Sequence, residues 1–332
     1  MSEAQDWTAA ARQQRYPTEA WLDGQPYCPA DGSRYPSSDP AHGGLLGQFA
    51  ACQPADVDLA VASARRAFNA GVWSRQSPAA RKSVLLKLAD LILAHRDELA
   101  LLESRDVGKP IGDALNVDIP GAANVFRWYA ESLDKVYGQV APLPPGVLAT
   151  ITREPLGVVA AVVPWNFPLD LASWKVAPAL AAGNSVILKP AEQSPATALR
   201  LAELATQAGL PDGVLNVLPG LGEVTGRALG LHPDVDCLAF TGSTEVGRYF
   251  MGYSAQSNLK QVWLELGGKS ANLVFDDCED LALAAQKAAF GVFYNQGEVC
   301  SANSRLLVQR GVYDAFMAHL VAQAALWQPG DP

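Results

Sequence analysis

Three segments of the chain contain residues that together could act on a carbonyl group. Cys300 lies in NQGEVCSANSR among small and polar residues, where neighbouring amides or a helix start would favour the nucleophilic thiolate. Glu265 ends an apolar segment in WLELGGKSA, and partial desolvation there would make it a general base. Asn166 in PWNFP is held between two prolines and could donate to an oxyanion.

Each of these residues also has a purely structural interpretation. A single cysteine is more often an inert residue of the core, a buried glutamate can be held by a backbone amide, and an asparagine between prolines suits a turn. None of the four histidines lies in a motif, so a Cys-His protease dyad has no support. The inert interpretation is applied to the remaining cysteines, which are Cys28, Cys52, Cys237 and Cys278.

Two further segments could bind a nucleotide. In FTGSTEVGR a predicted strand leads into Gly242 and a helix, whose positive N-terminal end would suit a diphosphate. A plain strand-to-helix turn is an equal alternative, because the G-x-G-x-x-G fingerprint is absent and GLGEVTG has the wrong spacing. Lys189 and Glu192 could bond the hydroxyls of an adenosine ribose, and the carboxylate would repel the extra phosphate of NADP. Two solvated charges in a turn are the alternative.

These residues follow predicted strands of one sheet. From Leu156 onward, short β-branched segments (GVVAAVV, NSVILK, VLNVL, CLAF and VWLEL) alternate with helical patterns, which predicts a doubly wound parallel α/β sheet. Helices are expected to start at Ser194–Pro195, as cap and first residue, and at Thr244. Because the carboxyl ends of parallel strands share one edge, we expect a ligand site there, formed by Asn166, Lys189, Glu192, Ser243 and Glu265.

The preceding part of the chain is expected to be helical after a loose, polar start of about fifty residues. Apolar spacing predicts a helix between Pro54 and Gly71 and a second from Ser77 through Leu99 to a break at residues 108–110. A third helix is predicted over 117–133, and Pro-Pro-Gly between two β-favouring pieces predicts a protruding hairpin at 140–155.

Composition limits the classes of partner. The 332 residues carry 25 Lys and Arg against 34 Asp and Glu, a net charge of -9, and 49% are hydrophobic, which indicates a globular protein of about two domains. The acidic balance argues against nucleic acid and anionic membranes and favours small molecules. Five scattered cysteines indicate free thiols and no metal site. With no leader pattern in MSEAQDWTAAARQQRYP and no long apolar stretch, a cytoplasmic location is expected.

Five of these segments, in their order and spacing, resemble the aldehyde dehydrogenase superfamily: PWNFP, LKPAE, FTGSTEVG, LELGGKS and NQGEVCSANSR. The resemblance extends from about Trp21 to Pro332 and includes the GKP turn at 108–110. It implies a Rossmann-like NAD-binding domain over 1–139 and 156–267 and an oligomerisation hairpin over 140–155. It also implies that 268–332 is the start of a catalytic α/β domain.

The resemblance assigns roles in aldehyde oxidation. Cys300 would attack the aldehyde, Asn166 and the Cys300 amide would stabilise the oxyanion, and hydride would pass to NAD. Glu265 would activate the water that hydrolyses the thioester, and Lys175 would lie on the helix bordering this glutamate. The implied cofactor contacts, with no metal, are Val163, Pro164, Trp165, Asn166, Lys189, Glu192, Gly222, Phe240, Thr241, Gly242, Ser243, Val246, Glu265, Leu266 and Gly267.

Within the superfamily, VWLELGGKSANLVF and FYNQGEVCSANSRLLV are most similar to the branch that oxidises aminoaldehydes, such as gamma-glutamyl-gamma-aminobutyraldehyde, with betaine aldehyde dehydrogenases near. A cationic substrate would need a carboxylate, for which Asp118 is the candidate, with Trp174 as a second substrate contact. Full-length members are expected to form homo-oligomers. Asn303 stands where the family commonly has glycine, which could tighten the loop around the thiol.

The family continues well beyond Pro332, including a glutamate that holds the nicotinamide ribose and one wall of the aldehyde tunnel. A truncated chain could therefore bind NAD without turnover, which is the second hypothesis. A third keeps thiol chemistry alone, with Cys300 and Asn166 hydrolysing activated esters.

Overall fold

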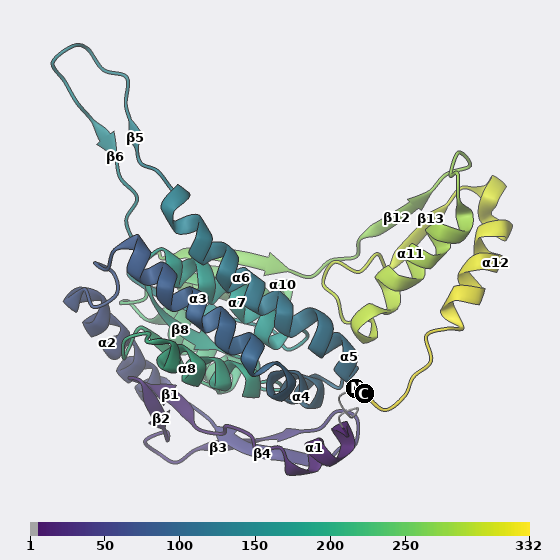
Figure 1. Cartoon of the computed structure of the whole chain (residues 1–332), viewed down its shortest axis with the longest axis horizontal. Coiled ribbons are helices and arrows are strands. Elements are labelled where there is room, and N and C mark those ends of the chain that lie inside the picture. The colour runs from purple at the N-terminus through teal and green to yellow at the C-terminus, as the bar shows by residue number, and fades with distance from the viewer. Residues whose placement is uncertain (1–5) are drawn as a thin grey trace.

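A seven-stranded sheet forms the centre of the molecule (Figure 1). The computed structural model describes residues 6–332. The first five residues of MSEAQDWTAAARQQRYP, which are also the start of the predicted first domain, lie outside the described residues. The predicted parallel strands are confirmed, and two antiparallel strands extend them. In spatial order they are β11 (Gln261–Leu266), β10 (Cys237–Gly242), β7 (Val158–Val162), β8 (Ser185–Lys189), β9 (Leu215–Val217), β1 (Ala20–Leu22) and β2 (Gln25–Tyr27).

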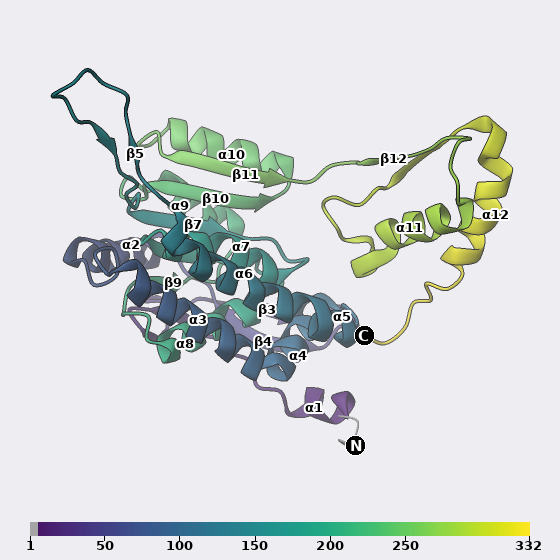
Figure 2. The same cartoon turned by 45° about the horizontal axis from the view of Figure 1, so that its top comes forward.

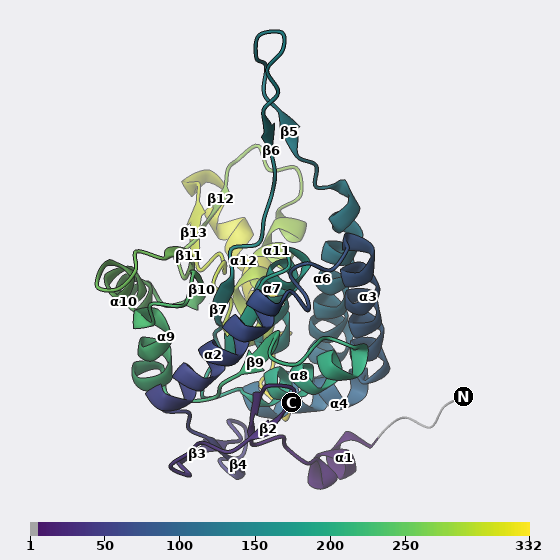
Figure 3. The same ribbon diagram turned by 90° about the vertical axis from the view of Figure 1, so that its left-hand side faces the viewer.

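Helices cover both faces of this sheet, as the doubly wound pattern predicts (Figure 3). Alternate residues of β7 point to opposite faces: Val159 joins the apolar cluster on one face and Val158 the cluster on the other. Strands buried on both faces read as continuous apolar runs, which made them recognisable in the sequence. The first face carries α3 (Pro78–Ala94), α6 (Ile119–Ser132), α7 (Pro168–Ala181) and α8 (Ala196–Ala208); the second carries α2 (Pro54–Ala70), α9 (Arg227–Leu231) and α10 (Thr244–Ala255).

The first fifty residues are more ordered than predicted. They contain α1 (Trp7–Gln13), β1, β2 and the hairpin of β3 (Arg34–Ser38) with β4 (Leu45–Ala50). β1 joins the main sheet antiparallel to β9, with Trp21 opposite Val217. The expectation of a loose start was wrong because these strands are short and their buried positions include polar residues such as Ser37.

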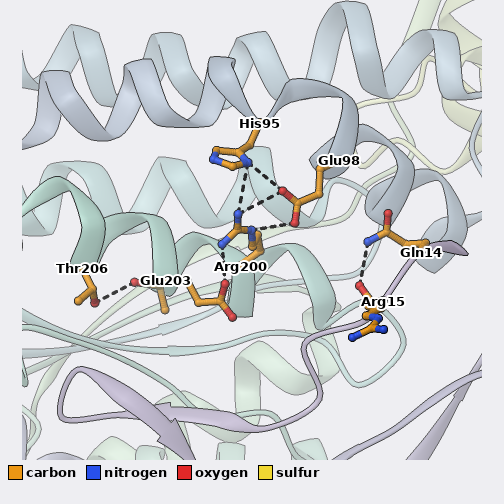
Figure 4. Close-up of polar contacts among 8 residues, drawn as sticks. Gln14, Arg15, His95, Glu98, Arg200, Glu203 and Thr206 are labelled. Atoms are coloured by element: carbon orange, nitrogen blue, oxygen red, sulfur yellow. Dashed lines mark hydrogen bonds and ion pairs between the residues drawn. The ribbon is translucent and has the colours of Figure 1, made fainter. Parts of the chain in front are cut away.

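The second predicted helix is two helices. α3 ends and α4 (Arg96–Val107) begins at His95, whose φ of -101° and ψ of 21° interrupt the helix. Figure 4 shows the His95 ring beside Glu98, and Glu98 in turn accepts a 2.8 Å hydrogen bond from Arg200 of α8. The break is therefore fixed by a polar contact with a distant helix, which helical spacing alone could not reveal. α4 ends at Gly108 with a left-handed φ of 78°.

The predicted cap of α8 was also wrong. The helix begins at Ala196, and Pro195, the cap position, offers no side-chain hydrogen bond. Asp106 of α4 supplies the missing acceptor, since its Oδ2 accepts the Ala196 N–H at 3.0 Å. The expected start of α10 is confirmed, with the Ser243 hydroxyl accepting the Val246 N–H at 3.2 Å.

Other predicted elements are confirmed. α2 ends at Gly71 in the left-handed conformation, with φ of 76°. α6 follows α5 (Ile111–Asp113) and a π-helical turn over Ala114–Asp118. The predicted hairpin is formed by β5 (Gln139–Val140) and β6 (Thr150–Ile151) and projects from the body of the molecule (Figure 3).

A smaller α/β unit follows β11, set apart from the main sheet (Figure 2). β12 (Ala271–Val274) pairs parallel with β13 (Arg305–Val308), and α11 (Leu281–Phe293) and α12 (Tyr313–Ala324) cover them. Its apolar core contains Val274, Ala285, Ala288 and Phe316. The connection from α11 to β13 carries Cys300. Across residues 6–332, no helix combines the length and apolarity needed to cross a bilayer.

Candidate active site

The Cys300 loop meets the carboxyl ends of the sheet around a cavity of about 270 Å³. The cavity brings together residues predicted for both the chemistry and the cofactor, from β7, β10 and β11 and from the smaller unit. Its lining consists of Pro164, Trp165, Asn166, Leu171, Thr241, Gly242, Ser243, Gly267, Gly297, Glu298, Val299 and Cys300. The predicted shared edge is therefore present, with an exposed thiol beside it.

Hydrogen bonds hold the Asn166 segment against the Cys300 loop. Asn166 is buried, and its Nδ2 donates to the backbone oxygen of Glu298 at 2.6 Å. In return, Asn295 Nδ2 donates to the backbone oxygen of Asn166 at 3.1 Å. Because the Asn166 amide nitrogen carries two hydrogens, one remains for a second acceptor in the cavity.

Asn295 is a site residue that the sequence analysis missed. It is 2% exposed and adopts a left-handed conformation with φ of 49°, as do Gln296, at 55°, and Gly297, at 78°. Non-glycine residues rarely adopt this conformation, and such outliers gather at functional sites. The Asn-Gln-Gly sequence was the available signal, since asparagine tolerates left-handed backbone better than most residues.

Lys175 connects α7 to the sheet edge. Its ammonium group donates to the Thr241 hydroxyl, and Thr241 lies directly opposite Glu265 in the pairing of β10 with β11. Burial lowers the pKa of Lys175 to about 8, while the nearby Glu265 charge opposes this shift. The structure thus places Lys175 near the glutamate, as the resemblance implied for its helix.

Glu265 is exposed, so the desolvation expected around it was wrong. β11 is the outer strand of the main sheet, and Trp263, two residues earlier on the same face, is 66% exposed. Glu265 also does not line the cavity, although Gly267 of the same segment does. The role of Glu265 as a general base therefore rests on the resemblance and on the position of Glu265 beside Thr241 and Lys175.

Gly242 is required by packing within the protein. A Cβ at this position would lie 2.4 Å from Cζ of Phe240, whose ring packs on Phe250 with centroids 5.0 Å apart. This explains the glycine without the close ligand approach suggested by the sequence. Phe240 directs its ring into the core, and Leu266 packs toward Gly247, so these predicted cofactor residues would offer only backbone to a ligand.

Lys189, Glu192 and Gly222 form a second group at the end of β8, outside the cavity lining. Lys189 is 2% exposed and its Nζ donates to Pro190 O at 3.0 Å, with Glu192 Oε2 at 3.6 Å. Burial lowers the pKa of Lys189, and Glu192 opposes that shift. The Lys189 side chain lies against Gly226, in the helical turn that starts at Gly222. Of the remaining predicted contacts, Val163 is buried and Val246 is partly exposed in the first turn of α10.

Asp118 cannot meet a substrate, which corrects the prediction made for it. It is 2% exposed and paired with Lys109, which is fully buried and also lies 3.5 Å from Glu103. A carboxylate that is buried and already paired with a lysine is not accessible to the ammonium group of a substrate. Trp174, in contrast, is 52% exposed and lines a separate cavity between α6 and α7.

Asn303 also has a structural partner. Its Oδ1 would lie 1.9 Å from a Cβ on Gly291, so the missing side chain of this α11 glycine makes room for the asparagine. Asn303, which stands where the family commonly has glycine, thus packs the end of the Cys300 loop against α11.

Comparison with known proteins agrees with this arrangement. The model of the aldehyde dehydrogenase family matches residues 27–332, and the chain belongs to this family. It is 55% identical over 312 residues to the NADP/NAD-dependent aldehyde dehydrogenase PuuC of Escherichia coli (strain K12), covering 94% of this chain and 63% of that protein. It is 50% identical over 328 residues to aminoacetaldehyde dehydrogenase of Pseudomonas aeruginosa, covering 99% of this chain and 66% of the relative.

Solved structures show the same fold. The crystal structure of gamma-glutamyl-gamma-aminobutyraldehyde dehydrogenase from Burkholderia cenocepacia J2315 superimposes with a TM-score of 0.97 at 56% identity. An indole-3-acetaldehyde dehydrogenase in complex with NAD+ has a TM-score of 0.98 at 50% identity. Each match covers 98% of this chain and 66% of the other. The chain thus spans just under two thirds of the length of these relatives.

Proposed function

We propose that the protein oxidises an aldehyde to the carboxylic acid with NAD, using Cys300 as the nucleophile. The observation that carries this proposal is the cavity that joins Cys300, Asn166 and the start of α10. A thiol, an amide donor and a helix N-terminus in one cavity are the groups needed to bind an aldehyde carbon, its oxygen and a diphosphate.

In the proposed mechanism, the Cys300 thiolate adds to the aldehyde carbon and its carbonyl π electrons move onto oxygen. Asn166 Nδ2 and the Cys300 backbone N–H donate to this oxyanion. When NAD is bound, the hydride leaving the carbon has an acceptor, and a thioester remains on Cys300. Glu265 takes a proton from water, whose oxygen attacks the thioester carbon. The C–S bond breaks, the acid is released, and the proton passes from Glu265 to the Cys300 sulfur. The Lys175 ammonium group would stabilise the glutamate charge between turnovers.

Several residues of the sheet edge fit NAD. The amides of Thr244 and Glu245 in the first turn of α10 have no partner within the helix and would face the diphosphate, with Gly242 and Ser243 alongside. Lys189 Nζ uses one hydrogen on Pro190 O and keeps the others for a ribose hydroxyl, while Glu192 would accept from the second hydroxyl. The carboxylate disfavours a ribose phosphate, so NAD is preferred, although the name of the E. coli relative includes both cofactors.

Aminoaldehydes are the proposed substrates. The names of two relatives support this class, since one is an aminoacetaldehyde dehydrogenase and another a gamma-glutamyl-gamma-aminobutyraldehyde dehydrogenase, at 50% and 56% identity. The indole-3-acetaldehyde enzyme at 50% identity shows that similar chains also take neutral aromatic aldehydes.

We further propose a homo-oligomer that uses the projecting β5–β6 hairpin. Its apolar side chains are exposed, with Val140 at 68%, Leu148 at 78% and Ile151 at 55%. Light scattering of the chain against a Leu148→Ser variant would test this. The five free cysteines favour a reducing compartment such as the cytoplasm.

The decisive experiment follows NADH absorbance with the 332-residue chain, NAD and 4-aminobutyraldehyde, beside a Cys300→Ala variant. Turnover that disappears in the variant is expected. NAD binding by calorimetry without any turnover would overturn the proposed oxidation for this chain and support the binding hypothesis. Hydrolysis of p-nitrophenyl acetate measured in parallel tests thiol chemistry alone, and hydrolysis unaffected by Cys300→Ser would eliminate the hypothesis that Cys300 hydrolyses esters.

A further inference from the structure

The Cys300 cavity contains a single acidic residue, Glu298. Among the twelve residues of its lining, Glu298 is the only carboxylic acid and Cys300 the only thiol, and none carries a basic group. Glu265 is exposed and lies outside this lining. The proposed mechanism requires a Cys300 thiolate, whereas an unassisted cysteine is only a few per cent ionised at neutral pH. A proton acceptor in the cavity would therefore speed the addition to the aldehyde.

Hydrogen bonds fix the backbone of Glu298 close to the thiol. The Glu298 N–H donates to the backbone oxygen of Asn295 at 2.9 Å, and the Glu298 oxygen accepts from Asn166 Nδ2 at 2.6 Å. Cys300 follows after one intervening residue, Val299, and all three line the same cavity. The loop thus holds a carboxyl group and the nucleophile together, beside the amide that would stabilise the oxyanion.

The Glu298 side chain is half-buried and incompletely paired. Its Oε2 is buried, and no donor within residues 6–332 forms a hydrogen bond with it. Burial raises the pKa of Glu298, and the charge of Lys109, already paired with Glu103 and Asp118, opposes this shift. At the start of the same loop, burial raises the pKa of Tyr294 to about 12, so this phenol stays neutral. A carboxylate in such surroundings is a stronger base than one in water.

We propose that the Glu298 carboxylate takes the proton of the Cys300 thiol, directly or through one water molecule, as the sulfur attacks the aldehyde. The S–H bond breaks and an O–H bond forms on Glu298, while the sulfur bonds to the carbonyl carbon and the carbonyl π electrons move onto oxygen. The proton then passes from Glu298 to solvent. Glu265 keeps the later step, in which it takes a proton from water. This inference rests on the proposed function for the identity of the nucleophile.

The test follows the alkylation of Cys300 by iodoacetamide from pH 6 to pH 10, by mass spectrometry of the peptide that contains Cys300. Glu298→Gln keeps the size of the side chain and removes the base. At pH 7 we expect this variant to react about tenfold more slowly than the parent chain. At pH 10 the two should react at the same rate, because the thiolate then forms without assistance. Equal rates at pH 10 also show that the loop of the variant is intact.

The direction of the change separates this role from a simple effect of charge. A carboxylate that only repels the thiolate would slow the parent chain, so Glu298→Gln would then react faster at pH 7. A faster or unchanged rate in Glu298→Gln at pH 7 would overturn the inference. Glu298→Asp keeps a carboxylate and should react faster than Glu298→Gln, whereas a role in packing alone predicts the opposite order. Glu279→Gln removes an exposed charge of the same α/β unit and is the matched control.

A second measurement needs no variant at Glu298. If a proton moves during the reaction at pH 7, the parent chain is alkylated more slowly in D2O than in H2O, and an equal or faster rate in D2O contradicts the inference. Slower alkylation in Glu265→Gln, with a parental rate in Glu298→Gln, would assign the proton to Glu265 instead.

Alkylation requires neither NAD nor an aldehyde, so it is independent of the proposed oxidation. Alkylation that depends on Glu298 in a chain that forms no NADH would leave this inference intact and overturn the oxidation alone. NADH formation together with a parental alkylation rate in Glu298→Gln would do the reverse.

Discussion

Two lysine-centred clusters contact helix α7, and they differ in how their charges are satisfied. Lys109 is fully buried with Glu103 and Asp118, and its Nζ lies 4.3 Å above the Phe167 ring. Lys175 is half-buried, donates to the Thr241 hydroxyl and faces an exposed Glu265. The first cluster is closed to solvent, and the second opens toward the candidate active site.

The closed cluster fixes the position of α7. Glu103 Oε2 accepts the Leu169 N–H at 3.2 Å, in the first turn of the helix, and burial raises the pKa of this carboxyl group. Asn166 lies just before that turn and Lys175 two turns later. Charges without access to solvent therefore serve structure here, and the incompletely satisfied charges at the open side remain available for chemistry.

We expect the largest effect on stability from a substitution that removes the lysine of the closed cluster. Lys109→Met would leave Asp118 and Glu103 buried without a cation, and we expect a loss of about 3–5 kcal/mol in the free energy of unfolding. Urea denaturation measures this. Lys175→Met is the comparison: it should change stability by less than about 1 kcal/mol and lower turnover. Equal stability losses in the two variants would contradict the distinction.

The open side depends on hydrogen bonds between loops. Asn295→Asp keeps the size of the side chain but removes its donor to Asn166 O, so we expect turnover to fall by about 10- to 100-fold, equivalent to about 1–3 kcal/mol. The rate at which iodoacetamide alkylates Cys300, followed by mass spectrometry of the peptide that contains Cys300, should also differ from that of the parent chain. Gln296→Asn, at the neighbouring exposed left-handed position, is the control and should behave as the parent chain.

Asp106 is a buried carboxylate that accepts a hydrogen bond from a backbone amide, whereas Asp118 is paired with a lysine. Burial raises the pKa of Asp106 to about 8, and its hydrogen bond to Ala196 N–H only partly offsets this. The folded state therefore holds a proton that the unfolded state releases near pH 4, so this group lowers stability as pH rises from about 4 to 8.

Asp106→Asn keeps an acceptor oxygen for Ala196 and cannot ionise. We expect it to be more stable than the parent chain at pH 8, by about 1–2 kcal/mol, and to lose this advantage near pH 4. Thermal unfolding at both pH values measures the difference. An advantage that is the same at pH 4 and pH 8 would show that ionisation is not the cause.

The smallest effect concerns cofactor choice. Glu192→Gln removes the half-exposed carboxylate beside Lys189, and we expect the ratio of NADP to NAD affinity to rise about fivefold, equivalent to about 1 kcal/mol. Calorimetric titration with each cofactor measures it. Glu223→Gln removes a nearby exposed charge and is the control, with a smaller expected change.

Local sequence patterns were sufficient for the parallel strands and most helices. β7, β8 and β10 are continuous apolar segments because they are buried on both faces, and α10 follows directly from its Ser243 cap. The shared edge of the parallel strands predicted Asn166 and Ser243 in one site, and the resemblance added Cys300; all three line the cavity. These features depend on residues close to one another in the chain.

The errors concern contacts between distant segments. The break at His95 involves Arg200, the start of α8 uses Asp106, and Asp118 is neutralised by Lys109 across a turn whose fold the sequence did not reveal. Helical spacing and residue type contain no information about such partners. For the same reason, the desolvation expected at Glu265 depended on what covers β11, which is a property of the assembled sheet.

The sequence by itself determined the family, the α/β architecture and the identity of the thiol and amide in the cavity, because each is encoded in short segments with a fixed local conformation. The tertiary structure decided which charges are free. Asp118 and Asp170 are both carboxylates near α7, yet packing places Lys109 against the first, whereas no ion pair within residues 6–332 includes the half-buried second. Burial and ion pairing are set by the three-dimensional neighbours of a side chain, so only the folded chain distinguishes the two.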